Sequence, residues 1–238
     1  MKKTIKILGV IILVAATLLL TVSCSVPTGK AKYDTSLTGE GTMIRMTKVK
    51  EQVDSYGIDD FVPSNKKSDF VLIKIKNYGD IVVALREDVA PITVKNFKKL
   101  VSEKFYDGTV FHRVMKDFMI QAGGYTSLGG QLYAKDSENI KGEFSDNGVV
   151  NNLTHVRGVI AMARISGMND SASSQFYIVH ETAENTRSLN GKYATFGYVL
   201  AGMDVVDAIA NCAVAGDANS PRPIADVVIE SITFVQPK

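Results

Sequence analysis

The chain has 238 residues, of which 45% are hydrophobic, so it is long enough for one large or two small domains and apolar enough to bury a core. Disorder along the whole chain is thereby excluded. The formal net charge is only +2, and 27 basic residues are interspersed with 25 acidic ones, which argues against DNA or RNA as a partner.

The first residues have the pattern of an export signal. Lys2, Lys3 and Lys6 form a positively charged start, and an apolar stretch follows over residues 7–22. That stretch is shorter than the roughly 20 residues that span a bilayer comfortably. We therefore expect a cleaved signal peptide over residues 1–23, with an uncleaved anchor as the alternative.

Small residues precede Cys24 in a pattern that resembles the bacterial lipoprotein box, although Thr21 stands where that box usually has leucine. In this interpretation Cys24 is acylated, and its lipid anchors a bacterial protein on the membrane, outside the cytoplasm. In the alternative, the signal is cut elsewhere and Cys24 has no special role. The other cysteine, Cys212, is expected to be a small buried residue without reactive chemistry.

Residues 24–68 are rich in Thr, Gly, Ser, Lys and Asp and show no sustained hydrophobic period, which is typical of a linker or tether. Residues 47–56 have some helical spacing, so local packing stays open as an alternative for residues 43–62. We expect the folded domain to comprise residues 69–238.

The folded domain begins with a predicted hairpin. Lysines alternate with isoleucines near the end of residues 69–76, as a strand with one wet face requires. Residues 77–80 predict a turn, and residues 81–85 form a wholly apolar return strand.

Two helices are predicted, one near each end of the domain. The first starts at Pro91, and residues 94, 97, 100 and 101 form one apolar face; the second covers residues 203–210 after Gly202. The last apolar run, residues 224–235, can pair with an early strand and close the sheet. Strand and loop signals fill the rest, so we expect a mainly β fold built as a closed antiparallel barrel.

Two segments carry a specific resemblance. Residues 111–121, FHRVMKDFMIQ, and residues 171–178, SASSQFYI, resemble the two signature segments of the cyclophilin-type peptidyl-prolyl isomerases. The resemblance extends over about residues 70–235 and implies an eight-stranded antiparallel β-barrel capped by two α-helices. It also implies catalysis of rotation about X-Pro bonds, with proline-containing polypeptides as partners.

The chemistry requires a cation beside an apolar pocket. Rotation about an X-Pro bond breaks no bond, so the enzyme needs a group that binds the twisted amide better than either planar form. A guanidinium can do this, and Arg113 matches the family residue with that role. The resemblance adds Gln121 and His112 at the catalytic centre, and assigns to substrate binding Phe118, Met119, Ala163, Arg164, Gln175, Tyr177, Leu189 and Tyr193.

Other classes of function fit the sequence less well. Three histidines and no paired-cysteine spacing predict neither a metal site nor a cofactor, and no nucleophile elbow surrounds the serines of residues 171–174. We expect a monomer. The alternatives left open are a chaperone that binds proline segments without significant catalysis and a scaffold at the membrane. Because Ser188 and Tyr193 replace the tryptophan and histidine of many eukaryotic cyclophilins, weak cyclosporin binding is predicted.

Overall fold

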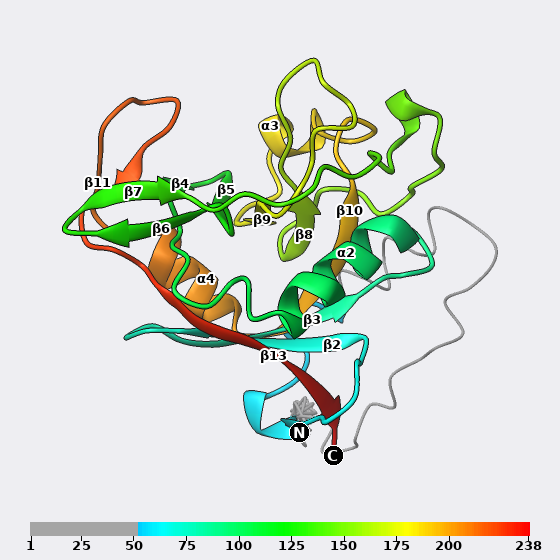
Figure 1. The fold of residues 1–238 in the computed structure, drawn as a ribbon, viewed down its shortest axis with the longest axis horizontal. Helices are drawn as coiled ribbons and strands as arrows, with labels where there is room; N and C mark the ends of the chain where they lie inside the picture. The colour runs from blue at the N-terminus through cyan, green and yellow to red at the C-terminus, as the bar shows by residue number, and fades with distance from the viewer. Residues whose placement is uncertain (1–51) are drawn as a thin grey trace, which may run out of the picture. The chain divides into compact units, whose positions relative to one another are not determined.

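The computed structural model describes residues 52–238. The predicted signal peptide, Cys24 and the first part of the predicted linker lie outside the described residues. Within the described range the fold is mainly β, with three α-helices: α2 (Pro91–Ser102), α3 (Glu184–Arg187) and α4 (Met203–Ala210) (Figure 1). No helix in this range is long and apolar enough to cross a membrane.

Nine strands form one antiparallel sheet, in the order β1, β13, β2, β3, β10, β8, β9, β5, β4. Their bounds are β1 (Phe61–Pro63), β2 (Phe70–Ile75), β3 (Gly79–Leu85), β4 (Arg113–Met115), β5 (Met119–Ala122), β8 (Val159–Met162), β9 (Phe176–Val179), β10 (Thr195–Ala201) and β13 (Ile229–Pro237). Outside this sheet, β6 (Tyr125–Leu128) pairs with β7 (Gln131–Ala134), and β11 (Val214–Ala215) pairs with β12 (Arg222–Pro223). Two 3₁₀ turns, η1 (Ile58–Asp60) and η2 (Ser145–Asn147), complete the elements.

The predicted hairpin and both predicted helices are confirmed. β2 and β3 pair with Ile73 opposite Ile81. α2 begins at Pro91 and buries its predicted apolar face, and α4 begins directly after Gly202. The φ of Gly202 is 94°, a left-handed conformation that favours glycine. The short α3 was not predicted, because four residues show no helical period.

The closed eight-stranded barrel is not confirmed, because no ladder of paired strands in residues 52–238 joins the two ends of the nine-stranded sheet. Backbone hydrogen bonds do connect residues 108–114 with residues 221–229: Phe111 N donates to Val227 O at 2.9 Å, and Val114 N donates to Pro221 O at 2.9 Å. Pro221 has no N–H to return such a bond, which limits regular pairing here. Barrel closure stays a prediction.

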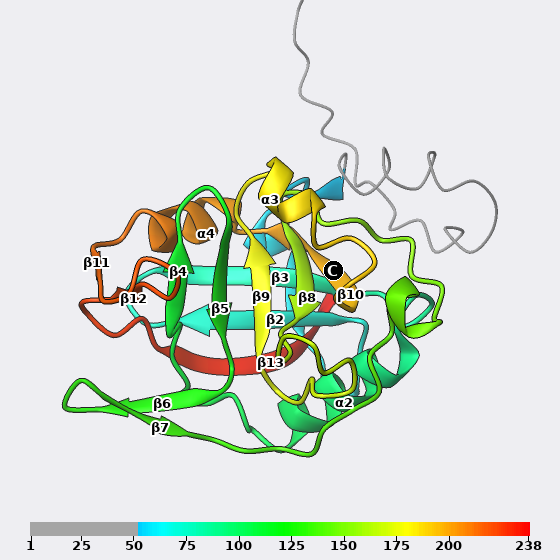
Figure 2. The ribbon, with the colours of Figure 1, turned by 90° about the horizontal axis from the view of Figure 1, so that it is seen from above.

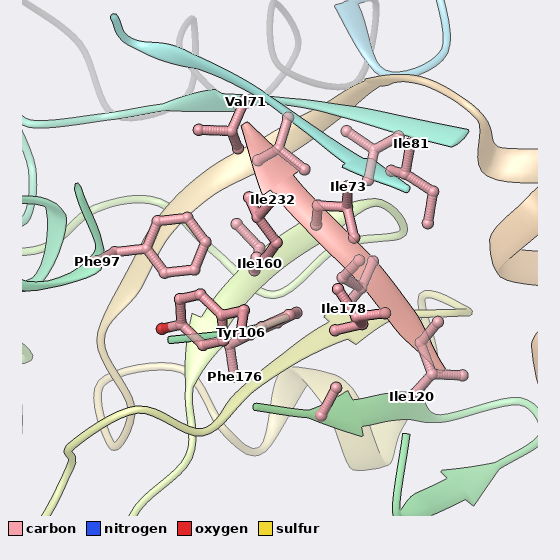
Figure 3. Packing of buried hydrophobic residues seen from close by; sticks show 14 of the residues in the cluster. Val71, Ile73, Ile81, Phe97, Tyr106, Ile120, Ile160, Phe176, Ile178 and Ile232 are labelled. Atoms are coloured by element: carbon pink, nitrogen blue, oxygen red, sulfur yellow. The ribbon is translucent and has the colours of Figure 1, made fainter. Parts of the chain in front are cut away.

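The sheet curves so that β2, β3 and β13 lie across from β4, β5, β8 and β9, while α2 and α4 lie at opposite ends (Figures 1 and 2). The space between these strands holds the hydrophobic core. Figure 3 shows Phe97 of α2 beside Tyr106 and Phe176, with isoleucines from several strands filling the middle. The apolar run of β3 is buried as predicted.

The ordered fold starts before the predicted boundary at residue 69. β1 pairs with β13, with Phe61 opposite Pro237. Further upstream, Asp54 N donates to Val199 O at 3.3 Å, and Asp54 Oδ1 accepts from the backbone N–H groups of Gly202 and Met203 at the start of α4. Residues 52–68, part of the predicted linker, therefore belong to the folded unit, in line with the alternative of local packing. The segment has few apolar residues, and two of them, Val53 and Phe61, pack against distant parts of the chain, so no local hydrophobic period predicts it.

Candidate active site

Antiparallel pairing brings several predicted residues to one face of the sheet. β4 pairs with β5 so that Arg113 lies opposite Gln121 and Met115 lies opposite Met119. β5 pairs in turn with β9, which sets Gln121 opposite Tyr177. Because side chains alternate between the two faces of a strand, these five share one face, and the intervening residues enter the core.

A pocket with a volume of about 120 Å³ lies over this face. The structure brings nine predicted site residues together around it: Arg113, Phe118, Met119, Gln121, Ala163, Arg164, Tyr177, Leu189 and Tyr193. Pockets for drug-sized ligands typically have roughly 300–1,000 Å³. This pocket therefore suits a group the size of one amino-acid side chain.

The Arg113 guanidinium is held by neutral partners. Its Nε donates to the backbone carbonyl of Asn219 at 3.0 Å, and its Nη1 lies 3.5 Å from Gln121 Oε1. The two terminal nitrogens also contact sulfur, with Nη2 3.0 Å from Met115 Sδ and Nη1 3.7 Å from Met119 Sδ. These contacts fix the orientation of the guanidinium without neutralising it.

No carboxylate within residues 52–238 forms an ion pair with Arg113. Burial lowers the pKa of Arg113 from its usual value, while Tyr193 acts in the opposite direction. An arginine remains charged at neutral pH because its usual pKa is so high. The pocket thus contains a half-buried cation whose charge is not compensated by the described part of the chain.

The amides of Gln121 and Gln175 are linked. Gln121 Nε2 donates to Gln175 Oε1 at 2.9 Å, which leaves Gln121 Oε1 facing Arg113. Gln175 itself is not among the pocket-lining residues, and its side chain lies against Gly124. A Cβ at position 124 would collide with that side chain, so glycine there permits the close approach.

The Tyr177 hydroxyl begins a chain of hydrogen bonds that passes through the buried His155 to the exposed Asn190. Its hydroxyl lies 2.8 Å from His155 Nε2, and His155 Nδ1 lies 2.9 Å from Asn190 Oδ1. Because an amide oxygen only accepts, His155 donates from Nδ1 and accepts the tyrosine proton at Nε2. Burial lowers the pKa of His155 to about 4, which keeps this arrangement neutral. The chain connects β9 to the loop that carries Leu189, so it joins two sides of the pocket.

The turn between β4 and β5 places Phe118. Asp117 has a φ of 60°, and its N–H donates to His180 Nδ1 at 3.0 Å. His180 N donates to Phe118 O at 2.9 Å, which ties the turn to the end of β9. The Phe118 ring lies 5.9 Å from the Arg113 guanidinium carbon, and it forms part of the pocket wall.

His112, predicted at the catalytic centre, is not among the residues that line the pocket. Neighbouring residues of an extended segment point to opposite sides, so the side chain next to Arg113 turns away from it. The His112 ring packs edge-on against Tyr125 with 4.7 Å between centroids. Burial lowers the pKa of His112 to about 4, so it is neutral at physiological pH.

Sequence reasoning missed three contributors to the site. The Asn219 carbonyl reaches Arg113 from more than 100 residues away, and a backbone group leaves no signal in a sequence. His155 and Asn190 were not assigned to the pocket; the only hint was that a tyrosine hydroxyl at position 177 needs a partner when buried.

Comparison with known proteins identifies the family. The model of the cyclophilin type peptidyl-prolyl cis-trans isomerase/CLD family matches residues 70–234. The chain therefore belongs to the cyclophilin-type peptidyl-prolyl cis-trans isomerase family, which confirms the class of enzyme expected from the two signature segments.

Relatives and solved structures agree with this assignment. The chain is 45% identical over 138 residues to a peptidyl-prolyl cis-trans isomerase of Acinetobacter baylyi, covering 57% of this chain and 69% of that protein. It is 41% identical over 165 residues to peptidyl-prolyl cis-trans isomerase B of Escherichia coli, covering 66% and 94%. A crystal structure of a Cryptosporidium parvum cyclophilin type isomerase in the presence of the dipeptide Ala-Pro aligns with a TM-score of 0.56 and 30% identity, over 69% of this chain and 98% of that one.

Proposed function

We propose that this chain accelerates rotation about X-Pro bonds in exported proteins and that Arg113 stabilises the twisted amide. The observation that carries the proposal is the uncompensated Arg113 guanidinium, which lines a small pocket together with Phe118, Met119 and Tyr177. The apolar side chains suit a proline ring. With the proline ring in this pocket, the Arg113 guanidinium can donate a hydrogen bond to the proline nitrogen.

The proposed mechanism needs no covalent step. In the planar X-Pro bond the nitrogen lone pair is delocalised into the carbonyl, and rotation of a peptide bond meets a barrier of about 18–20 kcal/mol. At the half-turn the lone pair returns to nitrogen, which becomes a hydrogen-bond acceptor. Arg113 then gains a charge-assisted hydrogen bond that neither planar form offers. Each tenfold acceleration requires about 1.36 kcal/mol of such selective stabilisation.

The side-chain amides of Gln121 and Gln175 support the proposed role of Arg113 by their positions. Gln121 Oε1 faces Arg113 Nη1, and Gln175 fixes the other end of the Gln121 amide. In the proposed mechanism this pair keeps the guanidinium oriented toward the pocket and offers polar groups to the substrate backbone. Preorganised donors of this kind avoid reorganisation when the amide twists.

The proposed clients are proteins outside the cytoplasm, and the support for this comes from the N-terminal sequence. A charged start, an apolar stretch and Cys24 together resemble a lipoprotein export signal, apart from Thr21. Slow X-Pro steps limit the folding of newly exported chains, so an isomerase tethered to the membrane is useful there. Mass spectrometry of the mature protein should find acylated Cys24 as its first residue. An unmodified or uncleaved N-terminus contradicts the lipid anchor on Cys24.

The isomerase proposal is tested with Arg113→Ala. Exchange between the cis and trans forms of a short X-Pro peptide, followed by NMR, should be fast with the wild-type protein. The variant should be slower by at least about 10-fold, because a charge-assisted hydrogen bond contributes roughly 1.5–3 kcal/mol.

Lys76→Gln serves as the control, since this exposed lysine also carries one positive charge but does not line the pocket. It should exchange the peptide at the wild-type rate. If the wild-type protein binds the peptide yet leaves exchange at its uncatalysed rate, the chain is a binding module and the proposal is wrong.

A further inference from the structure

Two guanidinium groups line the same pocket. Arg113 and Arg164 are both among its lining residues, and none of those residues is an aspartate or a glutamate. Neither arginine forms an ion pair with a carboxylate in the part of the chain that the structure describes. The pocket therefore has a positive charge that no carboxylate in the described part of the chain offsets by an ion pair.

Arg164 is fixed in place by neutral groups. Its Nε donates to Lys192 O at 2.8 Å, and its Nη1 donates to Ile165 O at 3.1 Å. The guanidinium carbon lies 4.7 Å from the ring centroid of Tyr193 and 5.2 Å from that of Phe144, a cation–π arrangement on two rings. These contacts orient the group but leave its charge in place.

The third nitrogen of the Arg164 fork, Nη2, has no hydrogen-bond acceptor among residues 52–238. The N–H groups of Nη2 are therefore free to donate a charge-assisted hydrogen bond, for which a carboxylate oxygen is a well-matched acceptor. A peptide that enters the pocket brings its neighbouring side chains to this nitrogen. An acidic side chain gains attraction from both arginines, and a basic one is repelled by both.

We infer that the site selects proline segments in which a residue adjacent to the proline carries a carboxylate, with Arg164 as the specificity-determining residue. This inference rests on the proposed isomerase function and names its substrate class. Since the pocket is open to solvent, we expect a moderate attraction, because exposed ion pairs are weak and partly desolvated ones are stronger.

The test compares peptides that differ in one side chain. Acetylated and amidated peptides with Glu, Gln or Lys next to the proline carry no other charge, and their cis–trans exchange is followed by NMR. The Glu peptide should have a kcat/KM about 3- to 10-fold above that of the Gln peptide, and the Lys peptide should fall below it. Placing the variable residue before or after the proline shows which neighbour Arg164 contacts.

Variants assign the preference to a residue. In Arg164→Gln the ratio of Glu to Gln peptide should fall below about 2-fold, Arg164→Lys should retain part of it, and Lys76→Gln should leave it unchanged. Because Lys76 is exposed and outside the pocket, it matches the change in net charge without altering the site. In the wild-type protein the ratio should also shrink at high salt, which screens such pairs.

Failure of the inference can be distinguished from failure of the proposed function. Equal kcat/KM for the Glu and Gln peptides in the wild-type protein, with both exchanged rapidly, overturns the inference and leaves the isomerase function intact. A ratio that survives in Arg164→Gln assigns the preference elsewhere and also overturns it. Absence of catalysis with every peptide overturns the proposed function itself.

Discussion

The hydroxyl of Tyr177 forms a hydrogen bond with His155, which does not line the pocket. Tyr177 is only 4% exposed and His155 only 1% exposed, so their 2.8 Å hydrogen bond is shielded from water. The two rings are also nearly parallel, at 13° and 5.9 Å. This hydrogen bond satisfies the buried hydroxyl, so the tyrosine ring can line the pocket. The sequence alone did not identify His155 as the partner of this hydroxyl.

Removing that hydroxyl should cost stability. In Tyr177→Phe the Nε2 atom of His155 stays buried without a donor, and an unsatisfied buried polar group costs about 1–3 kcal/mol. Urea unfolding should therefore show a lower free energy of unfolding by that amount, while the phenyl ring keeps the pocket apolar. Unchanged stability contradicts the hydrogen bond described here. Tyr133→Phe is a suitable control, since Tyr133 is 50% exposed.

The part of the site that lies within the signature segments was predictable from the sequence. Short signature segments place Arg113, Phe118, Met119 and Gln121 within one strand-turn-strand unit, so their proximity follows from local structure. Contacts made through the backbone carbonyl of Asn219 depend on the folded chain, and residue type does not encode them. The catalytic role that the resemblance assigns to His112 stays a prediction, since His112 does not line the pocket.

Helix α2 depends on a carboxylate from another part of the chain. Its N-cap residue, Ala90, has no side chain to cap the first turn. Glu143, which is 2% exposed, accepts from Ile92 N at 2.9 Å and from Thr93 N and Oγ1 at 2.7 Å each. A buried carboxylate at the start of a helix satisfies free N–H groups and interacts favourably with the helix dipole.

Truncating that carboxylate should loosen α2. Glu143→Ala should lower the free energy of unfolding by about 2–3 kcal/mol, because three hydrogen bonds are lost and both donors of Thr93 stay buried. Chemical denaturation measures the change. Glu138→Ala, whose carboxylate is 91% exposed and makes only a 3.8 Å contact with Lys99, should stay within about 0.5 kcal/mol of wild type. Equal effects from the two substitutions contradict the capping role.

Elements with strong local patterns were predictable, and elements defined by distant partners were not. Regular apolar spacing identified α2 and α4, and alternation identified the hairpin of β2 and β3. By contrast, β1 has three residues in a polar surrounding and is defined by its pairing with β13 near the other end of the chain. The same limit applies to Glu143, which lies about 50 residues from the helix that it caps.

Stability of the whole molecule should depend on pH through two histidines whose pKa is lowered, His112 and His155. The pKa of His112 and of His155 is lowered to about 4, chiefly by burial, from an ordinary value of 6.5. Between these two pH values the two histidines are protonated in the unfolded chain but remain neutral in the folded chain. The free energy of unfolding therefore falls as the pH drops from 6.5 toward 4, by at most roughly 3 kcal/mol per histidine.

Urea unfolding at several pH values tests this dependence. His155→Gln should lose less stability over the same range, because one of the two titrations is removed. Aspartates with a lowered pKa, such as Asp207, lose their contribution only below their ordinary value of 3.8. A free energy of unfolding that stays constant from pH 7 to pH 4.5 contradicts the lowered pKa of the two imidazoles.

The central claim is that the Arg113 guanidinium binds a twisted X-Pro bond more strongly than a planar one. The most direct measurement determines peptide affinity and cis–trans exchange rate on the same NMR samples of wild-type protein and Arg113→Ala. We predict that the exchange rate falls at least about 10-fold while the dissociation constant changes by less than about 3-fold, because the lost interaction belongs to the transition state. If affinity and exchange rate fall by the same factor, Arg113 serves ordinary binding and the claim is wrong.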